Sequence, residues 1–249
     1  MGWRLAIYLA AGIAAGIANG IAGGGTFFTF PTMLALGVPA LTANVSSSVG
    51  VLPSYLGGLR GFRRELRTRL GLLIRLAPAC AVGTVCGTVL LLRGAPGTFR
   101  VVVPWLISAA TLLFALSPLI IRRLAHLEHN HPTRRWALQI GVFAVALYGG
   151  YFGAGLGIML LAVMAVSLTD DLDALHGLRN ALSLIINLVA AVVFIVRGHL
   201  VMEAVSMLLI GTLIGGWLGT LLIQRLKPIT VRILIVLIGA VTAIRLWTT

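Results

Sequence analysis

Two short stretches of the sequence carry asparagine and serine at helical spacing within apolar surroundings. In "ANVSSS", Asn44, Ser47 and Ser48 stand at positions i, i+3 and i+4 and share one helix face. In "RNALSL", Asn180 and Ser183 repeat the first two of these positions. A face that offers amide and hydroxyl donors without carboxylates suits an oxyanion. The alternative is that these side chains form hydrogen bonds between helices.

Arg179 adjoins the second stretch and lies about five residues into an apolar run. A charged side chain is costly at membrane depth and usually marks a functional site, so Arg179 is predicted to supply charge to the anion. The alternatives are that it extends to the membrane surface or pairs with the acidic stretch "TDDLDA" (169–174). His176, which lies on the same face, and Glu203, at the start of a later apolar run, are candidates for a proton-linked role.

A glycine-rich segment precedes each Asn–Ser stretch, "NGIAGGGTFFTFP" (19–31) in one case and "GGYFGAGLGI" (149–158) in the other. Adjacent glycines favour a break in a helix, and broken backbone persists at membrane depth only where protein, water or ligand satisfies it. The helix that follows such a break presents N–H groups and its positive dipole end to an anion. The backbone donors predicted on this basis are Gly23, Gly24, Gly25, Thr26, Gly153, Gly155 and Gly157.

Close helix packing is the alternative explanation for glycines spaced four apart, because small residues at this spacing let membrane helices approach each other. We adopt this explanation for Gly12 and Gly16 and for the series Gly211, Gly215 and Gly219.

The elements that carry these residues are predicted to be transmembrane helices. The chain has 249 residues, of which 59% are hydrophobic and 10% charged, and its mean hydropathy is +1.05. Soluble domains contain roughly a quarter charged residues. We therefore predict an all-helical, multi-pass protein of the cytoplasmic (inner) membrane, surrounded by lipid bilayer. Its eight apolar runs are Trp3–Ala22, Ala40–Leu59, Leu70–Leu92, Thr98–Ile121, Trp136–Ala165, Ala174–Val196, Val201–Ile223 and Ile229–Trp247.

The order of these features occurs twice along the chain. Matching positions are 130 residues apart in the glycine segments and 136 residues apart in the Asn–Ser stretches. This match predicts an N-terminal repeat (1–125) and a C-terminal repeat (133–249) of about four apolar segments each, joined by a basic, histidine-rich loop (126–132). Duplicated halves are typical of secondary transporters, in which the binding site lies between the halves.

The two repeats are either parallel or inverted, depending on the path after the first glycine segment. If the chain crosses fully, both termini are cytoplasmic; if it turns back, each half has three crossings and the repeats are inverted. The positive-inside rule gives twelve basic residues inside and five outside in both cases. We favour the inverted form because it accounts for the broken backbone, and we expect one half to rock against the other.

The remaining sequence argues against other classes of function. The net charge of +13 reflects arginines in predicted cytoplasmic loops, not nucleic-acid binding. No motif for a catalytic nucleophile, a phosphate loop or a zinc protease is present, so we predict no enzyme activity and no cofactor. The stretch "HLEHNH" (126–131) does not fit the spacing of a tight metal site, and we predict no bound metal.

The blocks "GIAGGGTFFTFPTMLALGVPALTANVSSS" and "GLRNALSLIIN" resemble the TauE/SafE family of sulfite exporters, also called the 4-toluene sulfonate uptake permease family. The resemblance covers essentially the whole chain and is looser in the second half, where Leu161 stands at the position that matches Pro31. It implies a carrier of sulfite, sulfonate or a related small anion. The alternatives are an anion channel or facilitator and a carrier of small organic carboxylates. Substrate, direction, coupling ion and homo-oligomer formation stay open.

Overall fold

The computed structural model describes residues 2–21, 23–56, 63–95, 97–124, 134–168, 172–222 and 228–248. Within these ranges the chain forms helices and turns without strands, as predicted. The predicted loop 126–132 lies outside the described residues. The helices are α1 (Gly2–Ile21), α2 (Thr26–Ala35), α3 (Ala40–Gly50), α5 (Arg63–Thr68), α6 (Leu70–Arg93), α7 (Thr98–Leu124), α8 (Arg134–Tyr151), α9 (Leu156–Ser167), α10 (Leu172–Arg197), α11 (Met202–Leu222) and α12 (Pro228–Thr248).

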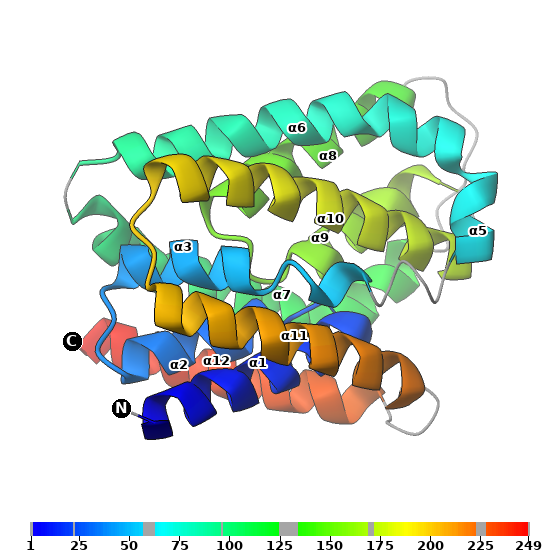
Figure 1. The fold of residues 1–249 in the computed structure, drawn as a ribbon. Helices are drawn as coiled ribbons and strands as arrows, with labels where there is room; N and C mark the ends of the chain where they lie inside the picture. Colours follow the sequence, from blue (N-terminus) through cyan, green and yellow to red (C-terminus); the bar gives the residue numbers. More distant parts are fainter. Residues whose placement is uncertain are drawn as a thin grey trace.

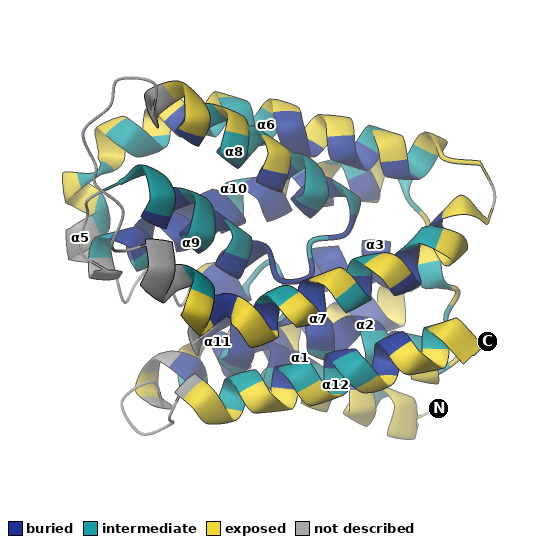
Figure 2. Ribbon diagram, turned by 180° about the vertical axis from the view of Figure 1, so that it is seen from behind, coloured by how far each residue is buried: buried dark blue, intermediate teal, exposed yellow. Residues whose placement is uncertain are grey.

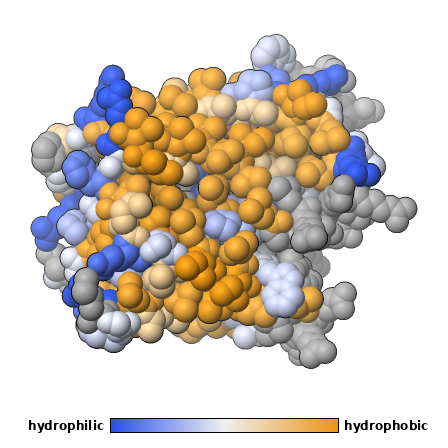
Figure 3. Space-filling view, viewed as in Figure 1, coloured by the Kyte–Doolittle hydropathy of each residue, from blue (hydrophilic) through white to orange (hydrophobic). Residues whose placement is uncertain are grey.

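In the described part of the chain, five helical segments are long and apolar enough to cross a membrane, and they lie in α6, α7, α10, α11 and α12. Large apolar side chains point outward from these helices, as in Ile74, Val101 and Val241, which are 69%, 70% and 64% exposed. Figure 3 shows a broad apolar band across one face of the molecule, with hydrophilic residues toward its two ends. A bilayer would cover such a band, and the multi-pass membrane prediction is confirmed.

Two predicted apolar runs do not form single spanning helices. The run Ala40–Leu59 forms α3 only as far as Gly50 and then turns at 51–53. Pro53 explains this end, because proline lacks an N–H and clashes with a preceding helical turn. The run Trp136–Ala165 is divided by a turn at 152–155 into α8 and α9. The 10 residues of α2 and 12 residues of α9 reach about half the roughly 20 that a membrane span requires.

The helices lie roughly along one common direction (Figure 1). α6 and α8 form one side, α1, α2, α11 and α12 form the opposite side, and α3, α9 and α10 lie between them. Figure 2 shows that the central helices are largely buried, whereas α6 and α12 expose their outer faces. Both termini lie at one end of the molecule, here called the terminal end, and α5 lies at the other, the α5 end. α2 runs back to the terminal end, and α9 runs toward the α5 end.

Two helix pairs pack with their backbones in contact, α1 against α11 and α6 against α8. A Cβ added to Gly12 would lie 3.0 Å from the carbonyl oxygen of Leu208, and one added to Gly16 would lie 2.6 Å from that of Thr212. Gly219 likewise lies against the backbone of Ile17. The packing explanation for these glycines is therefore confirmed.

Candidate anion-binding site

The two glycine segments both break the helix, and the two breaks meet inside the protein. Gly23 and Gly153 adopt left-handed backbone with φ of 78°, and Gly155 does so with φ of 76°. A Cβ added to Gly23 would lie 3.1 Å from the Cα of Gly157, so no side chain separates the two backbones. Glycine is required at Gly23 for both reasons, its left-handed φ and this close approach.

The first turn is held by a side chain that precedes it. The backbone N–H of Gly23 donates to the carbonyl of Ala18 at 3.0 Å, and that of Gly25 donates to Asn19 Oδ1 at 2.6 Å. The Asn19 amide in turn donates to the hydroxyl of Ser54 at 2.8 Å. Asn19 thus fixes the start of α2, and the N–H groups of Gly23 and Gly25 are engaged within the protein.

The second turn is held by Tyr148. Its backbone carbonyl accepts the N–H groups of Phe152 at 2.8 Å and Gly153 at 3.2 Å. Its phenol donates to the carbonyl of Ala154 at 2.6 Å. This turn therefore has a fixed shape without a ligand, and α9 begins directly after Gly155.

The half-helices α2 and α9 start at the meeting point and run to opposite ends of the molecule (Figure 1). Their N-termini, with the positive ends of their dipoles, are therefore directed at the same central region. Among the described residues, the N–H groups of Gly24 and Gly155 have no protein acceptor. Thr26, the first residue of α2, is 7% exposed. Backbone donors and dipoles of this kind favour an anion.

Arg179 lies against both turns. It is 1% exposed, so its guanidinium is enclosed by protein and does not extend to the membrane surface. Nη1 lies 3.6 Å from a Cβ added to Gly23, and Cδ lies 3.5 Å from a Cβ added to Gly157. Nη2 donates to Asn180 Oδ1 at 2.9 Å. No ion pair of Arg179 occurs among the side chains that the structure describes; Asp170, Asp171 and Asp173 lie outside them.

Among the residues that the structure describes, four buried polar atoms of α3 and α10 have no hydrogen-bond partner. They are Asn44 Oδ1, Arg179 Nη1, Asn180 Nδ2 and Ser183 Oγ, on residues that are 0%, 1%, 2% and 1% exposed. Buried polar groups are nearly always paired, and each unpaired one costs about 1–3 kcal/mol. All four belong to residues that the sequence predicts for the anion site.

The Asn–Ser face of α3 is attached to both broken regions. Asn44 Nδ2 donates to the carbonyl of Tyr151, directly before the second turn, at 3.0 Å. The hydroxyl of Ser47 shares a hydrogen bond with that of Thr29, which lies in α2 just after the first turn. α3 also packs against α10. The structure thus places Asn44 and Ser47 beside the turns, with Ser47 engaged by α2.

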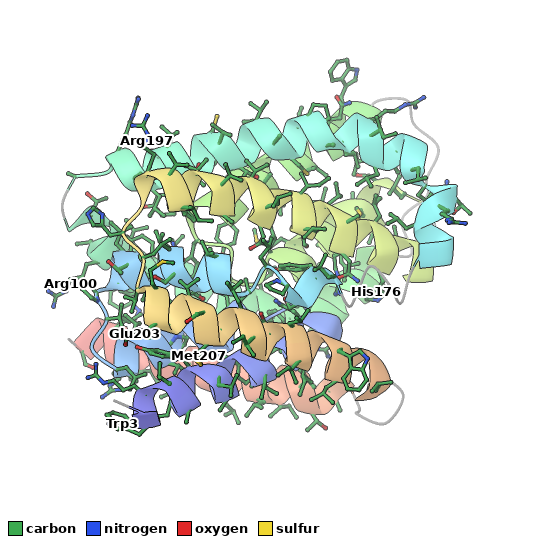
Figure 4. The ribbon with its side chains drawn as sticks, viewed as in Figure 1. Trp3, Arg100, His176, Arg197, Glu203 and Met207 are labelled. Carbon is green, nitrogen blue, oxygen red and sulfur yellow. The ribbon has the colours of Figure 1, made fainter. Side chains whose placement is uncertain are left out.

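The two candidates for a proton-linked role are not brought together. His176 lies near the α5 end of α10 and is partly buried, whereas Glu203 lies at the terminal end of α11 and is exposed (Figure 4). They therefore lie at opposite ends of the molecule.

A cavity of about 1210 Å³ lies beside α2 and is lined by residues of α2, α7 and α12 and by Tyr151. Its lining includes Phe28 and Thr32 of α2, Phe99, Tyr151, and the two arginines Arg100 and Arg245, and it contains no acidic residue among the described ones. Figure 4 shows Arg100 at the terminal end. Tyr151 lines the cavity, and its backbone carbonyl accepts the Asn44 amide, so this tyrosine contacts both the cavity and the site.

Sequence reasoning missed the residues that shape the turns, namely Asn19, Tyr148 and Tyr151. Asn19 stands within the quoted glycine segment, and a helix-terminal asparagine that can cap the next helix was the available signal. Tyr148 had no such signal, because its phenol bonds a carbonyl six residues onward only after the chain has turned.

Comparisons with known proteins point to one family. The sequence model of the family described as "Sulfite exporter TauE/SafE" matches residues 8–246. The chain is 22% identical over 238 residues to a "Probable membrane transporter protein" of Haemophilus influenzae, covering 94% of this chain and 91% of the relative. It is 22% identical over 228 residues to "Probable membrane transporter protein YfcA" of Escherichia coli K12, covering 90% and 82%. The chain belongs to the sulfite exporter TauE/SafE family of membrane transporters.

Proposed function

We propose that the protein is a secondary transporter that moves sulfite, a sulfonate or a related small anion across the cell membrane by alternating access. The observation that carries this proposal is the guanidinium of Arg179, which is buried at the meeting point of two half-helix N-termini with Nη1 unpartnered. A buried charge without a counter-ion is costly, so the arrangement is expected to hold an anion during its working cycle.

Each part of the site has a distinct task in this proposal. Arg179 Nη1 supplies positive charge, and Asn180 Nδ2 and Ser183 Oγ donate to oxygens of the anion, since all three atoms are buried and unpartnered. The N–H groups at Gly24 and Gly155 and the dipoles of α2 and α9 add partial positive charge. Gly23 and Gly157 keep the two turns close enough to act on one ligand.

We infer that the anion lies between two inverted repeats, which correspond to 1–125 and 133–249. The packing supports this, because the closest helix pairs have counterparts: α1 with α11 matches α8 with α6, and α2 with α3 matches α9 with α10. The opposite directions of α2 and α9 also fit inverted rather than parallel halves. Broken helices at equivalent positions are typical of inverted-repeat transporters.

The cavity supports an access route from the terminal end. Arg100 and Arg245 would attract an anion there, and no described acidic residue of the lining opposes them. Aromatic rings of the cavity lining and of the second turn pack in pairs, with Phe99 and Tyr151 centroids 5.9 Å apart and Phe30 and Phe152 centroids 5.5 Å apart. Alternating access requires these rings to separate on one side while the packing around α9 closes on the other.

Counterflow in proteoliposomes tests the proposal. Vesicles preloaded with unlabelled sulfite are expected to accumulate labelled sulfite in a saturable manner, with sulfonates and carboxylates as competitors that rank the substrates. Uptake that never saturates and shows no counterflow would indicate a channel instead. Loss of counterflow in Arg179→Ala, with correct assembly shown by size-exclusion chromatography, would assign the signal to this site.

A further inference from the structure

We propose that the site selects anions that carry one proton, such as hydrogensulfite, because Asn44 offers that proton a buried acceptor opposite the donors of Arg179 and Asn180. The inference rests on the proposed function and specifies the substrate form that the same site takes. Its starting point is that the four unpartnered atoms are not all donors.

The orientation of Asn180 is fixed by its neighbour. A guanidinium can only donate hydrogen bonds, so the atom of Asn180 that faces Arg179 Nη2 at 2.9 Å must be the amide oxygen. The free end of this side chain is therefore the NH₂ group. Asn180 and Arg179 Nη1 together present two unpartnered N–H donors to the ligand.

The orientation of Asn44 is fixed in the opposite sense. A backbone carbonyl can only accept, so the atom of Asn44 that faces Tyr151 O at 3.0 Å must be the amide nitrogen. The free end is the oxygen, which is a pure acceptor on a residue that is fully buried. An oxyanion without hydrogen would meet this oxygen with a lone pair and repel it. A ligand with one O–H satisfies it.

The donors and the acceptor belong to one site. Asn44 is bonded to the residue before the second turn, and its helix neighbour Ser47 is bonded to α2 after the first turn. Arg179 contacts both turns from α10, which packs against α3. Ser183 Oγ, which can donate or accept, completes the set without favouring either kind of ligand.

This selection would couple transport to protons without a protein carboxylate. The chain has six acidic residues, none of which lies in the middle of an apolar run. A singly charged anion also balances the single charge of Arg179, whereas a dianion would leave an excess negative charge in a low-dielectric site. The proton therefore crosses the membrane on the substrate itself.

The test compares two probes of the same shape and charge in the full-length protein. Methylphosphonate in its singly charged form at mildly acidic pH carries one O–H, and methanesulfonate carries none. We expect methylphosphonate to inhibit sulfite counterflow at a concentration at least about tenfold lower, because an unmet buried acceptor carries a penalty of that order. The advantage should disappear when rising pH removes the second proton, while inhibition by methanesulfonate changes less.

Asn44→Leu should bring the two inhibition constants to within about twofold, because the buried acceptor is gone. Ser48→Ala is the matched control: its hydroxyl donates to the backbone carbonyl of Asn44 within the same helix at 2.9 Å, and its loss should leave the ratio of the two inhibition constants unchanged. If Asn44→Leu fails to assemble, the ratio of the two inhibition constants in the wild-type protein, and the dependence of this ratio on pH, still test the proposal.

Equal inhibition by the two probes in wild-type vesicles that show saturable counterflow would overturn this inference and leave the proposed function standing. The same result together with a strong dependence on Na⁺ would mean that Asn44 Oδ1 binds a cation instead. Absence of counterflow with every anion would overturn the proposed function itself.

Discussion

Gly23 and Gly157 face each other so closely that a Cβ added to either would lie 3.1 Å from the Cα of the other. One residue belongs to the break between α1 and α2, and the other to the first turn of α9. The contact therefore joins two segments far apart in the sequence into one backbone surface. Arg179 contacts the same surface, which makes the contact a sensitive point for experiments on the site.

Gly23→Ala should weaken anion binding and lower the free energy of unfolding, because it adds a contact to Gly157 and strains a left-handed backbone by about 1–2 kcal/mol. Gly37→Ala is the matched control, since Gly37 has a similar φ of 81° but nothing within 4 Å of an added Cβ. It should show the strain alone, with unchanged affinity. Binding titrations in detergent measure the affinity for the anion, and thermal unfolding measures the stability. Equal anion affinities of the two variants would contradict a role for the contact with Gly157.

Arg179→Ala should weaken anion binding by about 10- to 100-fold, the range expected for a charge-assisted hydrogen bond in a buried site. Arg197→Ala provides a control on the same helix, because Arg197 is exposed at the terminal end of α10 (Figure 4). Counterflow and direct binding should both be near wild type in this control. An Arg179→Ala protein that binds the anion normally would remove Arg179 from the site.

Asn19→Ala should lower the free energy of unfolding by about 1–3 kcal/mol, because it leaves the N–H of Gly25 without its buried acceptor and removes the amide that donates to Ser54. Thr32→Val removes a hydroxyl that bonds only a carbonyl of its own helix, Phe28 O at 2.7 Å, and should have a smaller effect. Thermal unfolding monitored by intrinsic fluorescence measures both variants. Equal losses would mean that Asn19 does not anchor the turn.

Gly16→Ala should destabilise the fold by about 1–3 kcal/mol through overpacking, since the new methyl group would lie 2.6 Å from the carbonyl of Thr212. Gly71→Ala, in α6 with nothing within 4 Å, should be neutral or slightly stabilising, because alanine favours a helix over glycine. The affinity of the folded protein for the anion should be unchanged in both variants. A Gly16→Ala protein as stable as wild type would argue against close packing of α1 and α11.

Thr32→Cys tests the access route. In a Cys86→Ser background, which removes the exposed native thiol, a membrane-impermeant anionic thiol reagent should label this position from the terminal end. An excess of sulfite should slow the labelling. Thr84→Cys, at a fully buried position in α6, should not be labelled by the reagent, whether or not sulfite is present. Labelling of Thr32→Cys only from the α5 side would reverse the assigned access.

The sequence was informative where the signal is local. Helical spacing grouped Asn44 with Ser47 and Asn180 with Ser183, clustered glycines marked both breaks, and a charge in an apolar run singled out Arg179. The contacts that define the site could not be predicted in this way. Asn44 and Tyr151 are 107 residues apart, and the orientation of each amide depends on a partner that only the fold supplies. The direction of α2 was also undetermined, because both topologies gave the same count of basic residues.

The pairing of α1 with α11 also constrains how the protein is made. The glycine face of α1 finds its partner only after the ribosome has synthesised Met202–Leu222, so α1 must wait for α11. α6 must likewise wait for α8. Neither α1 nor α6 can therefore reach its final packing before the later helix has been made. A chain truncated before α11 would leave the face of α1 unmatched, as a target for quality-control proteases.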